Sequence, residues 1–379
     1  MQFADIQGLD QIKTSLIEAV RKDHVAHAQL FLGPEGSANL AMAIAFASYL
    51  NCEDPDESDS CGQCPSCLKN QKYIHPDVHY IFPVSGTEKF HGKEAVSNNF
   101  LKEWRSFLGE NLYGDVADWS GVWGENKNLN ISKEESRAII KKLSLKAFEG
   151  AYKIMIIWMP EYMHPAAANG LLKVLEEPSK NTVFLLVAHD SEKLLETILS
   201  RTQKVLIRAF EDEEIQLQLV AAGVAQDRAS HIARLAAGNL KLALRLASEV
   251  EEDSVESFKE WMRLCYGQNY TKLVGWSEEF HKMTKISQKG FIRFGLSTLR
   301  DTLVVHYGNS QLLKLTEDEK EFVKKFSQVV TPEKVEPLTN MFTEALFHLE
   351  RNGSPKMIFL DLALNISKLL KARQFETQN

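Results

Sequence analysis

The chain has 379 residues, of which 44% are hydrophobic and 25% charged, and its formal net charge at pH 7 is -7. This composition is typical of a globular protein with two or three domains and excludes a fibrous or disordered chain. The longest apolar run, AMAIAFASYL, is about half the roughly 20 residues that span a bilayer, and the N-terminus lacks a signal-peptide pattern. We therefore expect a cytoplasmic protein without membrane contact, whose negative charge argues against nucleic-acid binding over its whole surface.

Short apolar runs rich in Ile, Val and Phe predict buried strands in the first 210 residues. The runs lie at 28–33, 78–84, 152–159, 182–188 and 203–210, and helix-like stretches such as 131–148 and 164–179 separate them. This alternation predicts a parallel sheet with helices on both faces.

Beyond residue 210 the strand pattern gives way to helical patterns. We therefore expect an α/β domain over 1–209, a small helical lid domain over 210–252 and an all-helical C-terminal domain over 253–379. The first domain contains a cysteine-rich module at 52–67 and an insert at about 86–130.

The first predicted strand ends in a loop that resembles a phosphate-binding loop without its polar groups. Gly33 and Gly36 have the required spacing in FLGPEGSANL, but Ala38, Asn39 and Leu40 replace the last glycine, the lysine and the magnesium-binding hydroxyl. Taken alone, the stretch fits an ordinary strand-to-helix turn equally well. We expect no bound ATP.

Two further strand ends lack the groups that nucleotide hydrolysis requires. The third run ends in Trp158 and Met159, where an acidic pair would hold magnesium, and we expect Glu161 to be a solvated carboxylate at the start of a helix. Ala188 and His189 end the next run, where a polar residue would sense the γ-phosphate. A lone histidine without a neighbouring acid or nucleophile is a weak candidate for a catalytic base.

The order of these segments resembles the AAA+ clamp-loader family of bacterial DNA polymerase III. The resemblance covers residues 1 to about 250 and includes FADIQGLDQIKTSLIEAV, HAQLFLGPEG, AANGLLKVLEEPSKNTVFLLVA, ILSRTQ and AAGNLKLALRL. Motor subunits of this family keep a complete P-loop, whereas delta-prime subunits commonly have an eroded one, as here. The departures are the insert, whose Trp104, Trp119 and Trp123 we expect to form local core, and Thr202, where the family has cysteine.

The resemblance implies a non-catalytic stator subunit of the clamp loader with an AAA+ α/β domain, a lid and a helical collar. It implies assembly with the gamma/tau motor subunits and the clamp-opening delta subunit, and action on the sliding clamp and primer-template DNA through that complex. Ser200 and Arg201 match the family's arginine-finger motif, so Arg201 is expected to reach ATP bound by an adjacent motor subunit. Without the surrounding motifs, a surface arginine at a helix end would be the simpler interpretation.

Four of the five cysteines, Cys52, Cys61, Cys64 and Cys67, have the spacing C-x8-C-x2-C-x2-C. In a reducing compartment such crowding favours a metal over disulfides, and four thiolates form a closed tetrahedral site typical of structural zinc. The alternative is a set of reduced thiols in an acidic loop.

Two other classes of function fit parts of the sequence. An active ATP-hydrolysing motor of the same fold would need the missing lysine, hydroxyl and acidic pair from elsewhere. A zinc-dependent nucleic-acid-binding module would need a basic, aromatic surface around the cysteines, yet the stretch CEDPDESDSC is acidic and repels phosphates.

Overall fold

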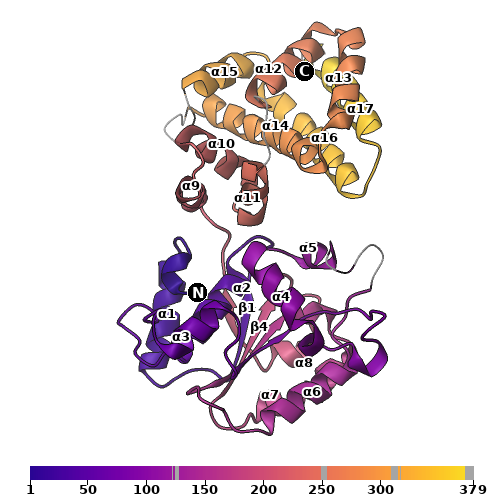
Figure 1. Cartoon of the computed structure of the whole chain (residues 1–379). Coiled ribbons are helices and arrows are strands. Elements are labelled where there is room, and N and C mark those ends of the chain that lie inside the picture. Colours follow the sequence, from indigo (N-terminus) through magenta and orange to yellow (C-terminus); the bar gives the residue numbers. More distant parts are fainter. Residues whose placement is uncertain (122, 124–127, 249–253, 309–314, 316, 372–379) are drawn as a thin grey trace, which may run out of the picture. The chain divides into compact units, whose positions relative to one another are not determined.

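The computed structural model describes residues 1–121, 123, 128–248, 254–308, 315 and 317–371. The chain divides into two compact units, of which the first comprises Met1–Gln218 with Ala237–Leu242, and the second Leu219–Ala236 with Ala243–Asn379 (Figure 1). The segment predicted as a lid contributes residues to both units, and its residues 249–252 lie outside the described part. The division into three domains therefore stays a prediction.

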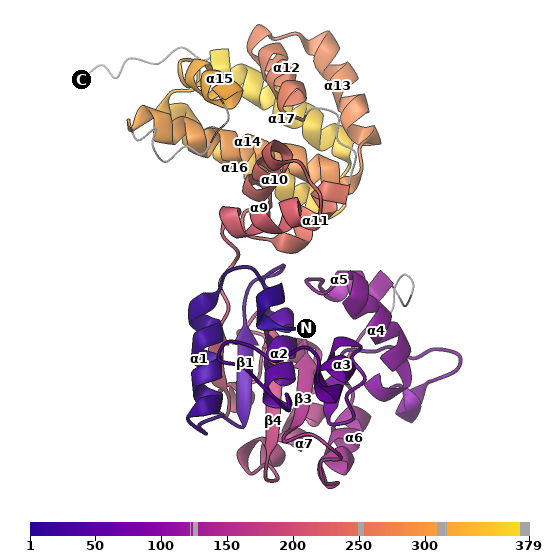
Figure 2. The ribbon, with the colours of Figure 1, turned by 60° about the vertical axis from the view of Figure 1, so that its left-hand side comes forward.

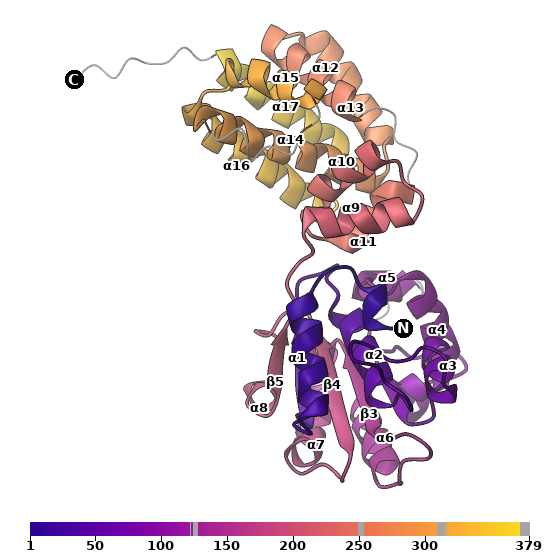
Figure 3. The same ribbon diagram turned by 90° about the vertical axis from the view of Figure 1, so that its left-hand side faces the viewer.

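Parallel strands form the sheet of the first unit, in the order β2-β3-β4-β1-β5. Figure 3 labels β3, β4 and β5 of this sheet. The strands are β1 (Ala28–Leu32), β2 (Val78–Ile81), β3 (Lys153–Trp158), β4 (Thr182–Ala188) and β5 (Gln203–Leu206). Each strand lies within a predicted apolar run. The register pairs Leu32 with Ala188 and Trp158 with Val187. The carboxyl ends of β1, β3 and β4 thus meet at the edge where open parallel sheets bind ligands.

Helices cover both faces of this sheet. On one face lies α2 (Asn39–Leu50), whose residues are all buried, and α1 (Asp10–Arg21) packs against it. On the other face, α6 (Lys133–Leu143), α7 (Pro165–Glu176) and α8 (Glu196–Leu199) share a hydrophobic core with the strands. The predicted parallel α/β fold is confirmed. The shorter elements of this unit are η1 (Phe3–Asp5), α3 (Pro65–Gln71), η2 (Gly92–Glu94), η3 (Ser97–Phe100), α4 (Leu101–Glu110), α5 (Val116–Gly121) and η4 (Pro160–Tyr162).

The insert folds around an aromatic core that continues the core of the sheet. Trp104 of α4 and Trp119 of α5 are fully buried. The Trp104 ring stacks on Phe82, with ring centroids 4.2 Å apart, and Trp119 Nε1 donates a hydrogen bond of 2.7 Å to the Pro83 carbonyl. These contacts confirm that Trp104 and Trp119 form local core, whereas Trp123 is only partly buried and has its ring centroid 4.5 Å from that of Phe100. Residues 122 and 124–127 of the insert lie outside the described part.

The described part of the second unit is helical, as predicted (Figure 2). Helix α14 packs against α15 and α16, and α17 packs against α12, α13 and α16. The side chains of Asn269 and Thr284 cap α13 and α14 by accepting hydrogen bonds from the first-turn N–H groups. The helices are α9 (Asp212–Ala221), which begins in the first unit, α10 (Gln226–Ala236), α11 (Leu240–Ser248), α12 (Ser254–Gly267), α13 (Tyr270–Lys282), α14 (Lys285–His306), α15 (Glu317–Ser327), α16 (Pro332–Glu350) and α17 (Pro355–Lys371).

None of the helices in the described part of the chain has both the length and the apolar character needed to cross a lipid bilayer.

Because Trp119 belongs to the aromatic core of the insert, we expect Trp119→Ala to destabilise the protein strongly. The substitution leaves a cavity and removes the donor to the Pro83 carbonyl, so we expect the free energy of unfolding to fall by about 3–5 kcal/mol. Urea denaturation followed by far-UV circular dichroism measures this loss. Phe148→Ala is the control because the Phe148 side chain is exposed (82%), and it should change stability by less than about 0.5 kcal/mol. Equal losses in the two variants would contradict the proposed packing.

Candidate functional sites

In the loop between β1 and α2, the side chains at the positions that would contact phosphate and magnesium are buried inside the protein. Asn39, at the lysine position, is 3% exposed. Its Nδ2 atom donates hydrogen bonds to the carbonyl of Ala188 at 3.1 Å and to the carbonyl of Gly33 at 3.4 Å. Leu40, at the hydroxyl position, is also buried. Both positions that would hold phosphate and magnesium therefore face the interior.

The two glycines of this loop are required by local packing. Gly36 has a φ of +74°, and a Cβ atom there would lie 2.0 Å from Oδ1 of Asn239. A Cβ atom at Gly33 would lie 2.5 Å from the Ile207 carbonyl oxygen. The Leu240 N–H also donates a 3.1 Å hydrogen bond to the Gly36 carbonyl. Local packing thus requires glycine at both positions, independently of any phosphate.

A half-buried glutamate, Glu161, bridges the ends of β3 and β4. The carboxylate of Glu161 accepts hydrogen bonds from the backbone N–H groups of His189 at 2.7 Å and Asp190 at 3.1 Å. Burial raises the pKa of Glu161 above its usual value. The prediction of a solvated carboxylate was wrong, because the turn after β4 supplies two donors that draw the side chain inward.

His189 carries no positive charge at neutral pH. Burial lowers the pKa of His189 to about 4, and the nearby Asp115 and Lys241 act on it in opposite directions. A neutral ring at this strand end offers no cation to a γ-phosphate.

Arg201 lies two residues after the end of α8, and its side chain is 29% exposed. The guanidinium forms an ion pair with Glu176, the last residue of α7, with Nε 2.7 Å from Oε1. It also donates to the Thr197 carbonyl at 2.8 Å and to Ser200 Oγ at 3.3 Å. The Thr202 hydroxyl, at the family's cysteine position, donates to a carbonyl of α8 at 3.2 Å. Arg201 is thus held at the surface by a partner that the sequence did not indicate.

The four predicted cysteines converge at one point. Their sulfur atoms all lie within 4.8 Å of one another. The Sγ atom of Cys67 is 3.6 Å from that of Cys52 and 4.0 Å from that of Cys61. Sulfurs held 2.3 Å from one tetrahedral ion would be about 3.8 Å apart. The donor set and its spacing therefore fit a closed metal site.

Backbone groups of the cysteine loop point at the sulfurs. The N–H groups of Cys61, Cys64 and Cys67 lie 3.2, 3.3 and 3.3 Å from the Sγ atoms of Cys52, Cys61 and Cys64. Hydrogen bonds from Gln63 and Cys64 lower the pKa of Cys61 to about 7, whereas burial raises the pKa of Cys67. A bound cation would favour the thiolate form of every member.

Two polar residues beside the cysteines have structural partners. The Asp59 carboxylate accepts hydrogen bonds from the N–H groups of Phe3 at 3.0 Å and Ala4 at 2.8 Å, which ties the cysteine loop to the N-terminus. His75 Nδ1 accepts from the N–H of Asp77 at 3.2 Å. His75 lies outside the group of four sulfurs, so the cysteines converge without it.

Sequence reasoning missed a cluster beside the phosphate-type loop. Lys241 forms ion pairs there with Asp115 and Asp118 of the insert. The stretch AAGNLK, which contains Lys241, belongs to the resemblance described above. It carries no signal that the insert supplies its partners.

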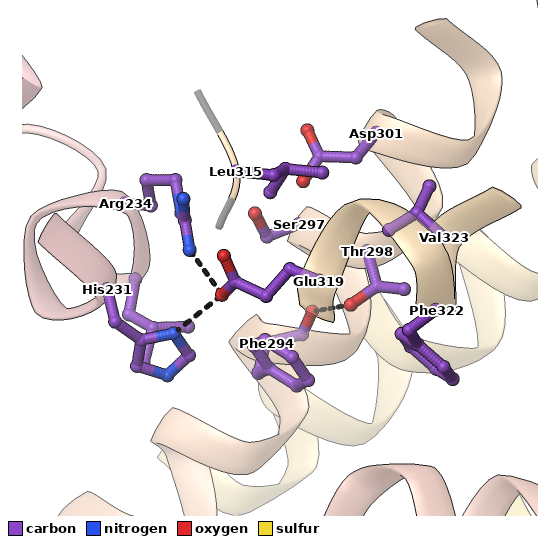
Figure 4. Close-up of a pocket in the computed structure, with 11 residues that line it drawn as sticks. His231, Arg234, Phe294, Ser297, Thr298, Asp301, Leu315, Glu319, Phe322 and Val323 are labelled. Carbon is purple, nitrogen blue, oxygen red and sulfur yellow. Dashed lines mark hydrogen bonds and ion pairs between the residues drawn. The ribbon is translucent and has the colours of Figure 1, made fainter. Parts of the chain in front are cut away.

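A charged cluster in the second unit is a packing feature (Figure 4). Glu319 of α15 accepts from Arg234 and lies 3.3 Å from Nδ1 of His231, both on α10. The cavity that these residues line has a volume of about 10 Å³. This is room for one water molecule at most and far below the range of ligand pockets.

Comparisons with known proteins give sequence relatives among DNA polymerase III subunits. Subunit delta' of Bacillus subtilis is 26% identical over 245 residues, which cover 65% of this chain and 59% of that protein. Subunit delta' of Pseudomonas aeruginosa is 29% identical over 52% of this chain and 48% of its own length. Subunit tau of Escherichia coli is 25% identical over 65% of this chain and 32% of its own length. The chain thus spans less than two thirds of the length of these relatives.

Among solved structures, a gamma subunit-related protein from Thermotoga maritima aligns with 94% of this chain and all of its own, at 15% identity and a TM-score of 0.37. Residues 8–211 match the family model described as DNA polymerase III, delta subunit. Since this match covers more than half of the sequence, the chain belongs to the DNA polymerase III delta subunit family.

Proposed function

We propose that the chain is a delta-prime-type stator of a DNA polymerase III clamp loader, with no ATPase activity of its own. In this role it supplies Arg201 in trans to ATP bound by a neighbouring motor subunit. One observation carries the proposal. Asn39 replaces the lysine of a phosphate-binding loop, and its amide is bonded to the carbonyls of Gly33 and Ala188 in the interior.

The position of Arg201 supports the trans role. The side chain is partly exposed and lies at the end of α8, and its carboxylate partner Glu176 is 48% exposed. An exposed ion pair contributes little to stability, so a phosphate group of a neighbour can replace Glu176 at small cost. The planar guanidinium donates several hydrogen bonds in the geometry that phosphoryl oxygens accept.

The proposed partners follow from family membership. We infer assembly with gamma/tau motor subunits and a clamp-opening delta subunit, and action on the sliding clamp and primer-template DNA through the complex. The helical second unit, and chiefly residues 253–379, would serve as the collar that holds the ring together.

The two alternatives have less support. An ATP-hydrolysing motor would need a lysine and a hydroxyl at positions where the buried Asn39 and Leu40 stand. A nucleic-acid-binding zinc module would need basic groups around the cysteines. The module spanning 52–67 instead carries five acidic residues and no Lys or Arg, which repels phosphate.

We also propose that the four cysteines hold one structural zinc ion. With four thiolate ligands the ion has no open position for water, and zinc prefers such closed tetrahedral sulfur sites. Its role would be to order a loop that is rich in Asp, Ser and Pro.

The isolated chain should neither bind nor hydrolyse ATP appreciably. The expectation follows from the interior positions of Asn39 and Leu40 and from Trp158 and Met159 at the end of β3. Isothermal titration calorimetry with magnesium-ATP tests it on the full chain. Micromolar affinity would contradict the closed site, whereas weak binding without turnover would leave the stator role intact.

Cys64→Ser should release the metal and lower the melting temperature of the first unit. Loss of one thiolate opens the site, and the free energy of metal binding no longer orders the loop. Elemental analysis of protein purified without chelator should give one zinc per wild-type chain and much less for the variant. Cys265→Ala is the control, because Cys265 lies in α12 and should leave the zinc content unchanged. Wild-type protein without zinc would contradict this assignment.

Arg201→Ala should leave the ring assembled but reduce its clamp- and DNA-stimulated ATPase. One motor site would lose a cation that acts in the transition state, where such arginines contribute about 10³–10⁵ in rate. The total loss should be partial because the other sites keep their own arginines. Lys should substitute poorly, since an ammonium lacks the planar set of donors.

Steady-state ATPase of the reconstituted complex is the measurement. Arg208→Ala is the matched control, because Arg208 is also partly exposed (44%) and paired with a carboxylate, that of Glu214. It should leave the rate unchanged. If the Arg201→Ala complex turns over ATP at the wild-type rate, Arg201 is only a surface arginine and the proposed trans role is wrong.

A further inference from the structure

The loop between α6 and β3, residues 144–152, presents two large apolar side chains to solvent. Phe148 is 82% exposed and Leu145 is 66% exposed. The loop contains neither helix nor strand, and such surface segments are ordinarily the more mobile parts of a domain. Its backbone is nevertheless bound at several points, and three of the residues that bind it lie beside the four cysteines in the sequence.

Asp77 accepts hydrogen bonds from three consecutive N–H groups of this loop. The donors are Phe148 at 2.6 Å, Glu149 at 2.8 Å and Gly150 at 2.7 Å. Asp77 directly precedes β2 and is 2% exposed, so the sheet fixes the position of its carboxylate. Hydrogen bonds to a charged acceptor are stronger than those between neutral groups. Asp77 therefore defines the path of the backbone at 148–150.

Asn51, which directly precedes Cys52, binds the same loop two residues further on. Its Oδ1 atom accepts from the Tyr152 N–H at 2.8 Å, and its Nδ2 atom donates to the Tyr152 carbonyl at 3.0 Å. A Cβ atom at Gly150 would lie 2.9 Å from Asn51 Oδ1, so the backbone passes close to this side chain. The first of the four cysteines is thus adjacent to a residue that holds the loop.

Lys69, two residues after Cys67, holds the loop through Glu149. The Nζ atom of Lys69 lies 2.6 Å from each carboxylate oxygen of Glu149. Lys69 belongs to α3, a helix of seven residues whose buried side chains are Ser66, Cys67 and Asn70. So short a helix is not stable by itself, and none of these three side chains is a large hydrophobic one. The sulfur of Cys67 is therefore a main anchor of the helix that carries Lys69.

The two ends of the cysteine loop (52–67) thus lead to residues that bind 144–152. We propose that the cysteine loop controls the conformation of 144–152 through α3 and Lys69, so that a metal ion on the four sulfurs keeps Leu145 and Phe148 in place. The ion would fix α3 relative to Asn51, and Lys69 and Asn51 would then hold the backbone at 149–152. This inference rests on the proposed metal site and gives it a role beyond ordering its own ligands.

A metal site that orders only its own surroundings predicts a different result. In that case Asp77 alone would hold 148–150, and loss of the metal would raise hydrogen exchange at 52–71 without any change at 144–152. Exchange in the second loop therefore distinguishes the two ideas.

The test is hydrogen–deuterium exchange of the full chain, with and without its metal, read by mass spectrometry. Removal of zinc by a chelator, checked by elemental analysis, should speed exchange at 146–152 about tenfold, the effect of losing one hydrogen bond to a charged group. Exchange in β4, at the centre of the sheet, should not change.

Lys69→Met should raise exchange at 146–152 while the chain keeps its zinc, because the variant breaks the link to Glu149 and leaves all four sulfurs. Lys22→Met is the matched control. Lys22 is also an exposed lysine paired with a carboxylate, that of Glu18 at 2.7 Å, and its loss should leave exchange at 146–152 unchanged.

Two results would overturn the proposal. One is unchanged exchange at 146–152 in a metal-free chain whose β4 stays protected, and the other is unchanged exchange there in Lys69→Met. If removal of the metal unfolds the whole first unit, Lys69→Met decides alone. Wild-type protein without zinc would refute the metal assignment itself, whereas the first two results refute the coupling in a chain that does bind zinc.

Discussion

The complete burial of α2 is the constraint on which the first unit depends. Every residue of NLAMAIAFASYL is shielded from water, so the helix must begin directly behind β1 and lie in the middle of the core. A helix that is apolar on all sides has no alternative position in a small α/β domain. The loop between β1 and α2 is therefore retained for the fold, whether or not it binds phosphate. Its glycines and the inward amide of Asn39 satisfy this requirement.

Two segments that leave the sheet, the cysteine loop (52–67) and the insert (about 86–130), differ in the interactions that hold them. The cysteine loop has few apolar side chains. Its four sulfurs converge at one point, and the Asp59 carboxylate ties it to the N–H groups of Phe3 and Ala4. The insert is ordered by hydrophobic burial, since Trp104 and Trp119 join Phe82 in a packed aromatic group. Both segments are anchored to the same sheet, so the polar residues of each have defined positions.

Local patterns predicted the strands and the cysteines, because the physical cause is local in both cases. A parallel strand buried on both faces must be apolar throughout, and thiolates that share one ion must be closely spaced. Sequence patterns did not predict interactions between residues that lie far apart in the chain. Glu161 was expected in solvent, Arg201 had no visible partner, and Lys241 pairs with Glu35, 206 residues earlier in the chain. Only the topology brings these groups together.

The buried amide of Asn39 limits which single substitutions the loop tolerates. Restoring lysine at this position alone would place an ammonium between two carbonyls in a site that is 3% exposed, where burial disfavours the charge. Above the loop, Asn239 occupies the space over Gly36, and Lys241 is already neutralised. Conversion of this loop into a nucleotide-binding loop would therefore need several concurrent substitutions, each unfavourable by itself.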